Sequence, residues 1–196
     1  MSLLIYNSDM KYAIRKEISG AEIKRIRKKN KLTQEEFASV CNTSKKTIQR
    51  WEASEGVSGP IVSIIELLIR NDDFLEDLTI PPRNEDYPLR LNYYDGNRLC
   101  TTIDVDDVHQ KVKIKNYVDF YLDRAFGNNK KPTYDDYQEF LSSRCFPSTR
   151  DKMKLILKDL NLPFYDPYMI VEKTKGRMAE DNFWIDIIGV REDRVV

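Results

Sequence analysis

The sequence lacks the residue patterns of metal-binding, disulfide-bonded and nucleotide-binding proteins. Its three cysteines, Cys41, Cys100 and Cys145, lie far apart, and its one histidine is His109. This is neither a zinc nor a disulfide framework, and an odd number of free thiols fits a reducing cytosol. The seven glycines do not cluster, so no glycine-rich loop is available to bind phosphate. We therefore expect no metal site and no cofactor.

Long apolar runs are also missing. The longest, Ile61–Ile69, is interrupted by Ser63 and Glu66, and no signal-peptide pattern is found. The sequence shows no set of a nucleophile, a base and a group that orients the base, so it gives no support to an enzymatic function. The chain of 196 residues is 41% apolar, which suffices for the buried core of one large or two small domains. We predict a cytoplasmic protein that is not an enzyme and does not cross a membrane.

The zero net charge conceals a strong separation of charge along the chain. Residues 11–51 hold twelve Lys or Arg against four Glu, a balance of +8. Residues 52–109 hold four basic against thirteen acidic residues, a balance of −9, and residues 110–196 hold sixteen against fourteen, a balance of +2. One compact basic block is typical of a surface that contacts phosphates. A solvated helix face would give the same count, so the charge alone does not decide.

Start signals for four short helices lie in and just after the basic block. Ser19–Glu22 and Thr33–Glu36 each have the spacing of a capping box, in which a hydroxyl and a carboxylate satisfy each other's backbone N–H groups. Ser44 is a candidate cap for a third helix, with Ile48 and Trp51 inward. Pro60 suits the first turn of a fourth. The predicted buried side of the second helix is Phe37, Ala38 and Val40, and that of the fourth is Ile61, Ile64, Ile65, Leu68 and Ile69. Helices this short must share one core.

The spacing between the second and third helices predicts a helix-turn-helix. Gln34, Ala38, Asn42 and Ile48 stand at offsets of zero, four, eight and fourteen. Ala38 is small where two helices approach closely, and Ile48 fixes the third helix on the second. Asn42 must turn the chain sharply, and asparagine tolerates a positive φ better than most residues.

The segment Leu32–Glu52 resembles the XRE/Cro-type helix-turn-helix. The longer run from Ser19 to Asp72 is similar to the DNA-binding domains of MqsA- and HigA-type antitoxins. The sequence departs from the family at Asn42, where the family prefers glycine, and at Thr43, where it prefers an apolar residue. The resemblance implies a DNA-binding regulator that acts as a homodimer on an inverted repeat.

The same resemblance implies which residues contact double-stranded DNA. The base-reading positions of the family fall on Lys45, Lys46 and Arg50, and Gln34 falls where the family contacts the sugar-phosphate backbone. Gln49 also faces outward and can reach an adenine or a phosphate, while Arg50 suits guanine. The further candidates for phosphate contacts are Thr33, Ser44, Thr47, Lys28 and Lys29. For Thr33 and Ser44, helix capping alone is an equal alternative. Lys11, Arg15 and Lys16 extend the basic block as a candidate arm beside the site.

A second domain is expected after a proline-containing linker. We predict a helix-turn-helix domain at residues 1–78 with its motif at 33–52, a linker at 79–88 and an α+β domain at 89–196. The second domain should hold a hairpin turning at Asp95–Asn97, a third strand at Gln110–Tyr117 and a last strand at Phe183–Val190. Its predicted helices lie at Tyr117–Phe126, after Thr133, after a Ser148 cap and after Asp166-Pro167. The predicted fold class is α+β, an all-α helix-turn-helix bundle followed by a small domain with an antiparallel sheet and several helices.

Two patterns in the second domain remain open. Asp104, Asp106 and Asp107 are expected in a solvated turn between strands, although a metal site is the alternative. A segment around Arg144, Pro147, Arg150, Gly176, Asp181 and Trp184 weakly resembles a region ahead of the kinase part in HipA-like toxins, whose kinase motifs are absent here. The resemblance implies a docking module of a toxin–antitoxin locus, and an ordinary dimerisation or effector domain is the alternative.

These expectations predict an autorepressing antitoxin-like regulator with a cognate toxin as a possible partner. Two alternatives are kept. One is a phage or mobile-element repressor whose second domain senses a signal, and the other is a protein-interaction module with a vestigial helix-turn-helix.

Overall fold

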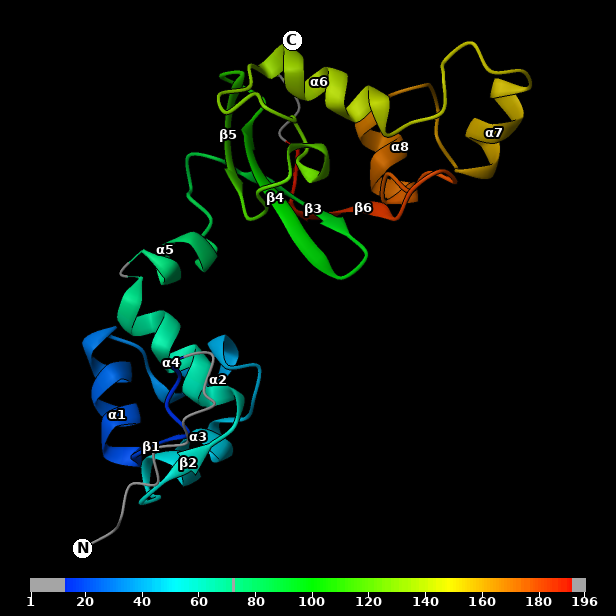
Figure 1. The fold of residues 1–196 in the computed structure, drawn as a ribbon. Helices are drawn as coiled ribbons and strands as arrows, with labels where there is room; N and C mark the ends of the chain where they lie inside the picture. The colour runs from blue at the N-terminus through cyan, green and yellow to red at the C-terminus, as the bar shows by residue number, and fades with distance from the viewer. Residues whose placement is uncertain (1–12, 72, 192–196) are drawn as a thin grey trace, which may run out of the picture. The chain divides into compact units, whose positions relative to one another are not determined.

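The structure, a computed structural model, describes residues 13–71 and 73–191 and divides the chain into two compact units. The first runs to Thr79 and the second starts at Ile80. Each is described by itself (Figure 1). Lys11 of the candidate arm lies outside the described residues. The predicted α+β class is confirmed, because a helical unit precedes a unit built on an antiparallel sheet.

The N-terminal unit is a bundle of short helices. They are α1 (Gly20–Lys29), α2 (Gln34–Val40), α3 (Lys45–Glu52), α4 (Pro60–Arg70) and α5 (Phe74–Leu78). A two-residue ladder between β1 (Glu17–Ile18) and β2 (Val57–Ser58) joins the segments before α1 and α4. No sequence pattern predicted this ladder, since strands of two residues carry no readable alternation.

One shared core holds this unit together. Ile23 of α1, Phe37 of α2, Ile48 of α3 and Ile65 of α4 are all fully buried, so each helix contributes a large side chain. Burying such a side chain stabilises the fold by about 1.5–3 kcal/mol. Trp51 is half-buried and packs against this core. The helices are too short to persist alone, and this packing is what makes them stable.

The helix start signals are confirmed in part. At α2 the capping box is complete, with Thr33 and Glu36 exchanging both hydrogen bonds. At α1 only half of the predicted box forms: the Ser19 hydroxyl accepts from the Glu22 N–H, but the Glu22 carboxylate pairs with Arg15 at 2.9 Å. A guanidinium is a stronger partner for a carboxylate than a neutral N–H group, so the ion pair replaces the second bond.

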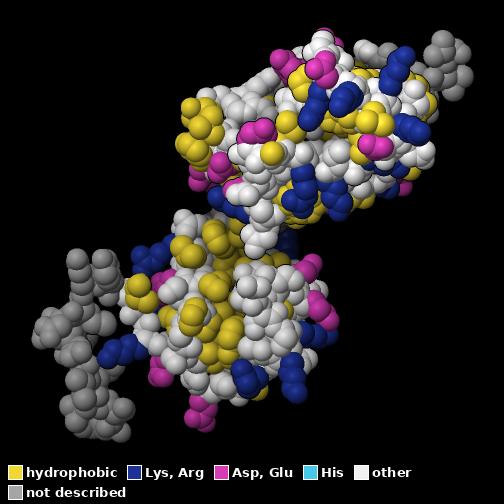
Figure 2. All heavy atoms as spheres, turned by 90° about the vertical axis from the view of Figure 1, so that its right-hand side faces the viewer, with side chains coloured by type: hydrophobic (Ala, Val, Ile, Leu, Met, Phe, Trp, Pro, Cys, Tyr) yellow, Lys and Arg dark blue, Asp and Glu magenta, His cyan; other side chains and the backbone are white. Residues whose placement is uncertain are grey.

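The apolar stripe of α4 differs from the prediction at its C-terminal end. Ile61, Ile65 and Leu68 are buried as expected, but Ile69 is 42% exposed and Val62 is buried in its place. Figure 2 shows hydrophobic side chains gathered on one face of this unit. The exposed large hydrophobic residues that the structure records up to Thr79 are Ile14, Leu67, Ile69 and Leu78.

The C-terminal unit is a four-stranded antiparallel sheet covered on one face by helices. Its strands are β3 (Leu89–Asp95), β4 (Arg98–Asp106), β5 (Lys111–Asn116) and β6 (Phe183–Gly189), in the order β5-β4-β3-β6. The predicted hairpin between β3 and β4 is confirmed, with Gly96 in a left-handed turn. Leu91, Ile103 and Ile185 point from the sheet into a core.

Helices α6 (Tyr134–Ser143) and α8 (Pro167–Thr174) supply the other side of this core, and α7 (Met153–Asp159) lies between them in sequence. The predicted helix starts at Thr133 and Asp166 are confirmed, and both side chains cap their helix by accepting from one of its backbone N–H groups. The predicted cap at Ser148 is wrong. The helix begins after Lys152, which has a φ of 60°. A left-handed residue stops an α-helix, so no helix can run from Ser148 through this point.

The predicted helix at Tyr117–Phe126 is also wrong. Only a short 3₁₀ turn forms, at Tyr121–Asp123. The Arg124 guanidinium donates to the carbonyls of Val118 and Asp119, at 2.9 Å each. These carbonyls would accept backbone N–H groups in a helix, and aromatic and β-branched residues favour helix weakly. A side chain therefore satisfies the carbonyls in an irregular segment.

The three aspartates expected in a solvated turn are buried instead. Asp104 and Asp106 lie within β4, and Asp107 follows it. The guanidinium of Arg90 on the facing strand pairs with Asp104 through two bonds, and the Tyr134 hydroxyl donates to Asp107 at 2.8 Å. Buried carboxylates need such partners. A cross-strand ion pair and a tertiary hydrogen bond thus explain how the carboxylates of Asp104 and Asp107 can be buried.

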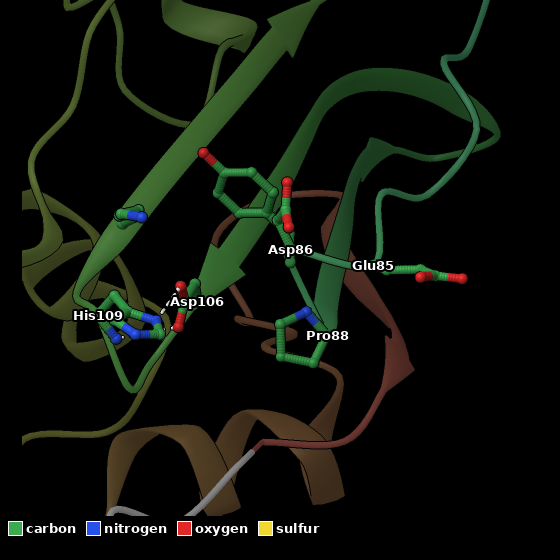
Figure 3. Close-up of a pocket in the computed structure, with 7 residues that line it drawn as sticks. Glu85, Asp86, Pro88, Asp106 and His109 are labelled. Carbon is green, nitrogen blue, oxygen red and sulfur yellow. Dashed lines mark hydrogen bonds and ion pairs between the residues drawn. The ribbon is translucent and has the colours of Figure 1, made fainter.

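Asp106 pairs with the single histidine of the chain beside a cavity. The backbone N–H of His109 donates to Asp106 at 3.0 Å, and its Nδ1 lies 2.7 Å from the same carboxylate (Figure 3). The cavity measures about 370 Å³, and Glu85, Asp86 and Pro88 also line it. Among residues 13–71 and 73–191, no group of three His, Cys, Asp or Glu side chains is arranged to hold a metal ion.

Candidate nucleic-acid interface

The turn between α2 and α3 sets the geometry of the candidate interface. Asn42 has a φ of 47°, so it takes the left-handed conformation that the sequence predicted. The next residue, Thr43, donates its N–H to the carbonyl of Ala38 at 2.9 Å and closes the turn. Ala38 of α2 and Ile48 of α3 are both buried in the shared core of the unit. The two helices are therefore held as one rigid pair.

The outer face of α3 presents polar and basic side chains. Lys45, Lys46, Gln49 and Arg50 are all exposed, while Ile48 points into the core. Lys46 and Arg50 make no side-chain hydrogen bond or ion pair with any residue that the structure describes. Their charged groups are thus available to a ligand in front of α3. The structure places the predicted base-reading residues together on one helix face.

Lys45 already has a partner in α2. Its ammonium lies 2.6 Å from the carboxylate of Glu35, and both side chains are exposed. An exposed pair of this kind contributes about 0–1 kcal/mol. Lys45 can therefore exchange Glu35 for a DNA group at a small cost in free energy.

A buried hydrogen-bonded set holds Gln34 at the start of α2. The Gln34 amide donates to Glu52 at 2.9 Å, and Glu52 in turn accepts from Arg27 at 2.6 Å. Arg27 also donates to the carbonyl of Leu32 at 2.8 Å. The Gln49 side-chain amide donates to the side-chain oxygen Oε1 of Gln34 at 3.4 Å, so the set reaches the exposed face of α3. Through it, α1, α2 and α3 are fixed relative to one another.

Electrostatics within this set favour the charged forms. Burial raises the pKa of Glu52, but the hydrogen bonds from Arg27 and Gln34 outweigh it, so the pKa lies below its ordinary value. The pKa of Arg27 is raised, chiefly by its hydrogen bond to Glu52. Glu52 and Arg27 are both buried, at 6% and 10% side-chain exposure. The sequence analysis missed both residues. Arg27 stands four residues after Ile23, on the apolar side of α1, and this position was the signal that it is buried.

Two of the three hydroxyl residues predicted to contact phosphates, Thr33 and Ser44, are helix caps in the structure. Thr33 accepts from the N–H of Glu36, and Ser44 accepts from the N–H of Thr47, at 3.2 Å each. The Ser44 and Thr47 hydroxyls also lie 3.0 Å apart. Because a hydroxyl that accepts one bond can still donate its proton, the phosphate role of these residues stays a prediction. Lys28 and Lys29 are exposed on the last turn of α1.

The motif noted in the second unit folds into a clamp. Arg144 is buried and binds both carboxylate oxygens of Asp181, at 2.6 and 3.0 Å. Its Nε donates to the Gly176 carbonyl at 3.0 Å. These contacts fasten the loop after α8 to the end of α6. Arg144, Gly176 and Asp181 are thus brought together, whereas Arg150 remains exposed.

Comparison with known proteins agrees with the geometry of the first unit. Residues 23–68 match a family model described as helix-turn-helix, of the XRE type. No curated protein and no solved structure matches the chain. In the described part of the chain, no helix has both the length and the apolar character needed to cross a membrane. The match and the exposed basic face of α3 support a DNA-binding regulator of transcription.

Proposed function

We propose that the protein is a sequence-specific transcriptional regulator that inserts α3 into the major groove of DNA. The observation that carries this proposal is the face of α3, where Lys45, Lys46, Gln49 and Arg50 are exposed opposite the buried Ile48. The N-terminal turn and outer face of a recognition helix contact base edges. Arg50 would bind guanine through two hydrogen bonds, Lys45 and Lys46 would act as point charges, and Gln49 would reach adenine or a phosphate.

The start of α2 would bind the DNA backbone. Its N-terminal N–H groups favour an anion, and Gln34 is held there by Glu52. The side chains of Thr33, Ser44, Thr47, Lys28 and Lys29 would add phosphate contacts around it. Such contacts fix the position of the protein on the duplex but do not read sequence.

Two copies would bind an inverted repeat, with recognition helices about 34 Å apart in successive major grooves. The exposed apolar side chains of the N-terminal unit, including Leu67 and Leu78, support a homodimer, because exposed apolar patches mark interaction sites. The protein would act in the cytoplasm, without enzymatic activity. Autorepression as an antitoxin, with a cognate toxin bound by the second unit, is the proposed biological role.

A second candidate is a repressor whose C-terminal unit senses a signal. The observation that favours it is a cavity in that unit lined by two arginines, Arg150 and Arg177, whose side chains make no hydrogen bond or ion pair with a described residue. Co-purification with the product of a neighbouring gene would support the antitoxin role, whereas release of DNA by a small ligand would support the sensing role.

A salt-dependent gel-shift assay tests DNA binding itself. The full chain should bind duplex DNA with an affinity that falls steeply as salt rises, because phosphate contacts release counterions. A module with a vestigial helix-turn-helix would bind weakly at every salt concentration, and this result would contradict the proposal.

A further inference from the structure

A cavity of about 270 Å³ opens in the C-terminal unit where the ends of α6 and α8 meet the loop that follows α8. Part of its lining is apolar and comes from Phe146, Ile170 and Met178. Ile170 is fully buried, so this wall belongs to the core of the unit. The cavity therefore has an apolar side anchored in the core at Ile170, and its volume suits a small organic molecule.

Two further arginines line the cavity, and their side chains have no hydrogen-bond or ion-pair partner among the described residues. Neither Arg150 nor Arg177 makes a side-chain hydrogen bond or ion pair with any residue in the described ranges. A guanidinium carries five N–H donors in a planar fork and is matched by the oxygens of a carboxylate or phosphate. Two such groups at one cavity point to an anionic ligand.

Arg177 is also held in place before any ligand arrives. Its guanidinium carbon lies 5.2 Å from the centre of the Trp184 ring, within the range of a cation–π contact. Trp184 is itself fixed, since it stacks on Tyr94 at 4.5 Å and donates to the Gly96 carbonyl at 2.6 Å. A side chain that is already ordered loses less entropy when it binds a ligand.

The clamp of Arg144 and Asp181 builds one side of the same cavity. Arg144 lines it, but Asp181 neutralises its charge, and its Nε donates a hydrogen bond to the Gly176 carbonyl. Arg144 is therefore a positioning residue, which holds the loop that carries Arg177. Glu180 also lines the cavity, so its lining holds two arginines without an ion-pair partner and one carboxylate. This balance favours a ligand with a single anionic group.

We propose that this cavity binds a small organic anion, whose carboxylate or phosphate head lies between Arg150 and Arg177 and whose compact body contacts Phe146, Ile170 and Met178. The site does not depend on DNA binding. It makes the C-terminal unit a sensor of a small anion. The residues Arg144, Arg150 and Gly176 would then all contribute to one ligand site, by lining it or by holding the loop that lines it.

Fluorine NMR of the full chain labelled with 5-fluorotryptophan tests this site. The chain has two tryptophans, so two resonances are expected, and Trp184→Phe assigns them. Titration with inorganic phosphate and, separately, with butyrate should shift the Trp184 resonance saturably and leave that of Trp51 in place. Saturation by phosphate alone, by butyrate alone or by both supports the site and identifies the head group.

Two variants decide whether the arginines are responsible. Arg150→Gln should weaken binding of the active anion by about tenfold or more, since it removes a charge-assisted contact, and Arg177→Gln should do the same. The charge-matched control Lys130→Gln, at an exposed loop position, should bind as the wild type. The proposal is overturned if neither anion gives a saturable shift of Trp184, or if Arg150→Gln binds as tightly as the control.

Discussion

The guanidinium of Arg27 lies 2.6 Å from the carboxylate of Glu52, and this contact joins α1 to the end of α3 beneath the candidate DNA-binding face. Glu52 also accepts from Gln34, so one carboxylate ties together the first three helices of the unit. The orientation of α3 therefore depends on a polar contact as well as on the shared apolar core. This arrangement can be tested by changing Glu52.

Glu52→Gln should lower the free energy of unfolding of the N-terminal unit by about 3 kcal/mol, because it leaves the buried Arg27 charge without a counterion. Urea denaturation at pH 7 measures the change. The control is Glu66→Gln, which breaks the more exposed pairs with Arg15 and Arg70 and should cost about 0–1 kcal/mol. Equal losses for the two variants would contradict the structural role of Glu52.

The turn residue Asn42 gives a second prediction. Because its φ is 47°, Asn42→Val should destabilise the unit by about 1–2 kcal/mol through steric strain in the left-handed region. Asn42→Gly should change stability by less than about 1 kcal/mol, since glycine takes this conformation freely but loses more entropy on folding. Thermal unfolding of both variants measures the difference. A valine variant as stable as the glycine variant would show that the turn is not left-handed.

Acid should weaken the C-terminal unit through Asp181. The hydrogen bond from Arg144 lowers the pKa of Asp181, while its value in the unfolded chain is about 3.9. The stability from this pair is thus present above about pH 4 and is lost as the pH falls through the lower folded pKa. Asp181→Asn should be less stable than the wild type at pH 7, and the gap should narrow by pH 3. A gap that stays constant in urea denaturation would refute the pairing.

Local rules predicted much of the fold. The predicted caps at Thr33 and Ser44 and the predicted helix starts at Thr133 and Asp166 are confirmed, because each depends on a hydroxyl or carboxylate and an N–H group three residues away. The hairpin at Gly96 and the left-handed Asn42 are confirmed for the same reason: each is set by the intrinsic preference of one or two residues.

The wrong or missed predictions concern residues whose structure is determined by side-chain contacts, most of them with residues far away in the sequence. The Asp104 carboxylate was expected in a solvated turn, but its partner Arg90 lies fourteen residues earlier, on the adjacent strand β3. Arg27 and Glu52 are twenty-five residues apart, so neither was identified as part of the candidate site. The predicted helix at 117–126 fails through a nearer contact, because the Arg124 side chain binds the carbonyls of Val118 and Asp119 that a helix would use. Spacing along the chain does not reveal such contacts.

For the candidate interface, the sequence predicted which residues share the outer face of α3, and the structure adds how they are held. The pairing of Lys45 with Glu35 was not anticipated, because it joins two helices across the turn. The base-reading and phosphate-binding roles themselves remain predictions.

Phosphate contacts should be separable from base contacts by their salt dependence. Lys28→Gln should weaken binding to specific and scrambled duplexes to a similar extent and reduce the slope of log affinity against log salt by about one. Fluorescence anisotropy at several salt concentrations gives both quantities. Lys130→Gln serves as the control in the C-terminal unit, and its slope should equal that of the wild type. An unchanged slope for Lys28→Gln would remove Lys28 from the interface.

Selection of bound sequences from random duplex DNA tests the central claim most directly, with the wild type and Arg50→Ala run in parallel. The wild type should enrich an inverted repeat whose half-sites are about 34 Å apart, and Arg50→Ala should lose about 1–3 kcal/mol of affinity and relax one base pair in each half-site. No enriched sequence for the wild type, or an identical consensus with undiminished affinity for Arg50→Ala, would contradict base reading by α3.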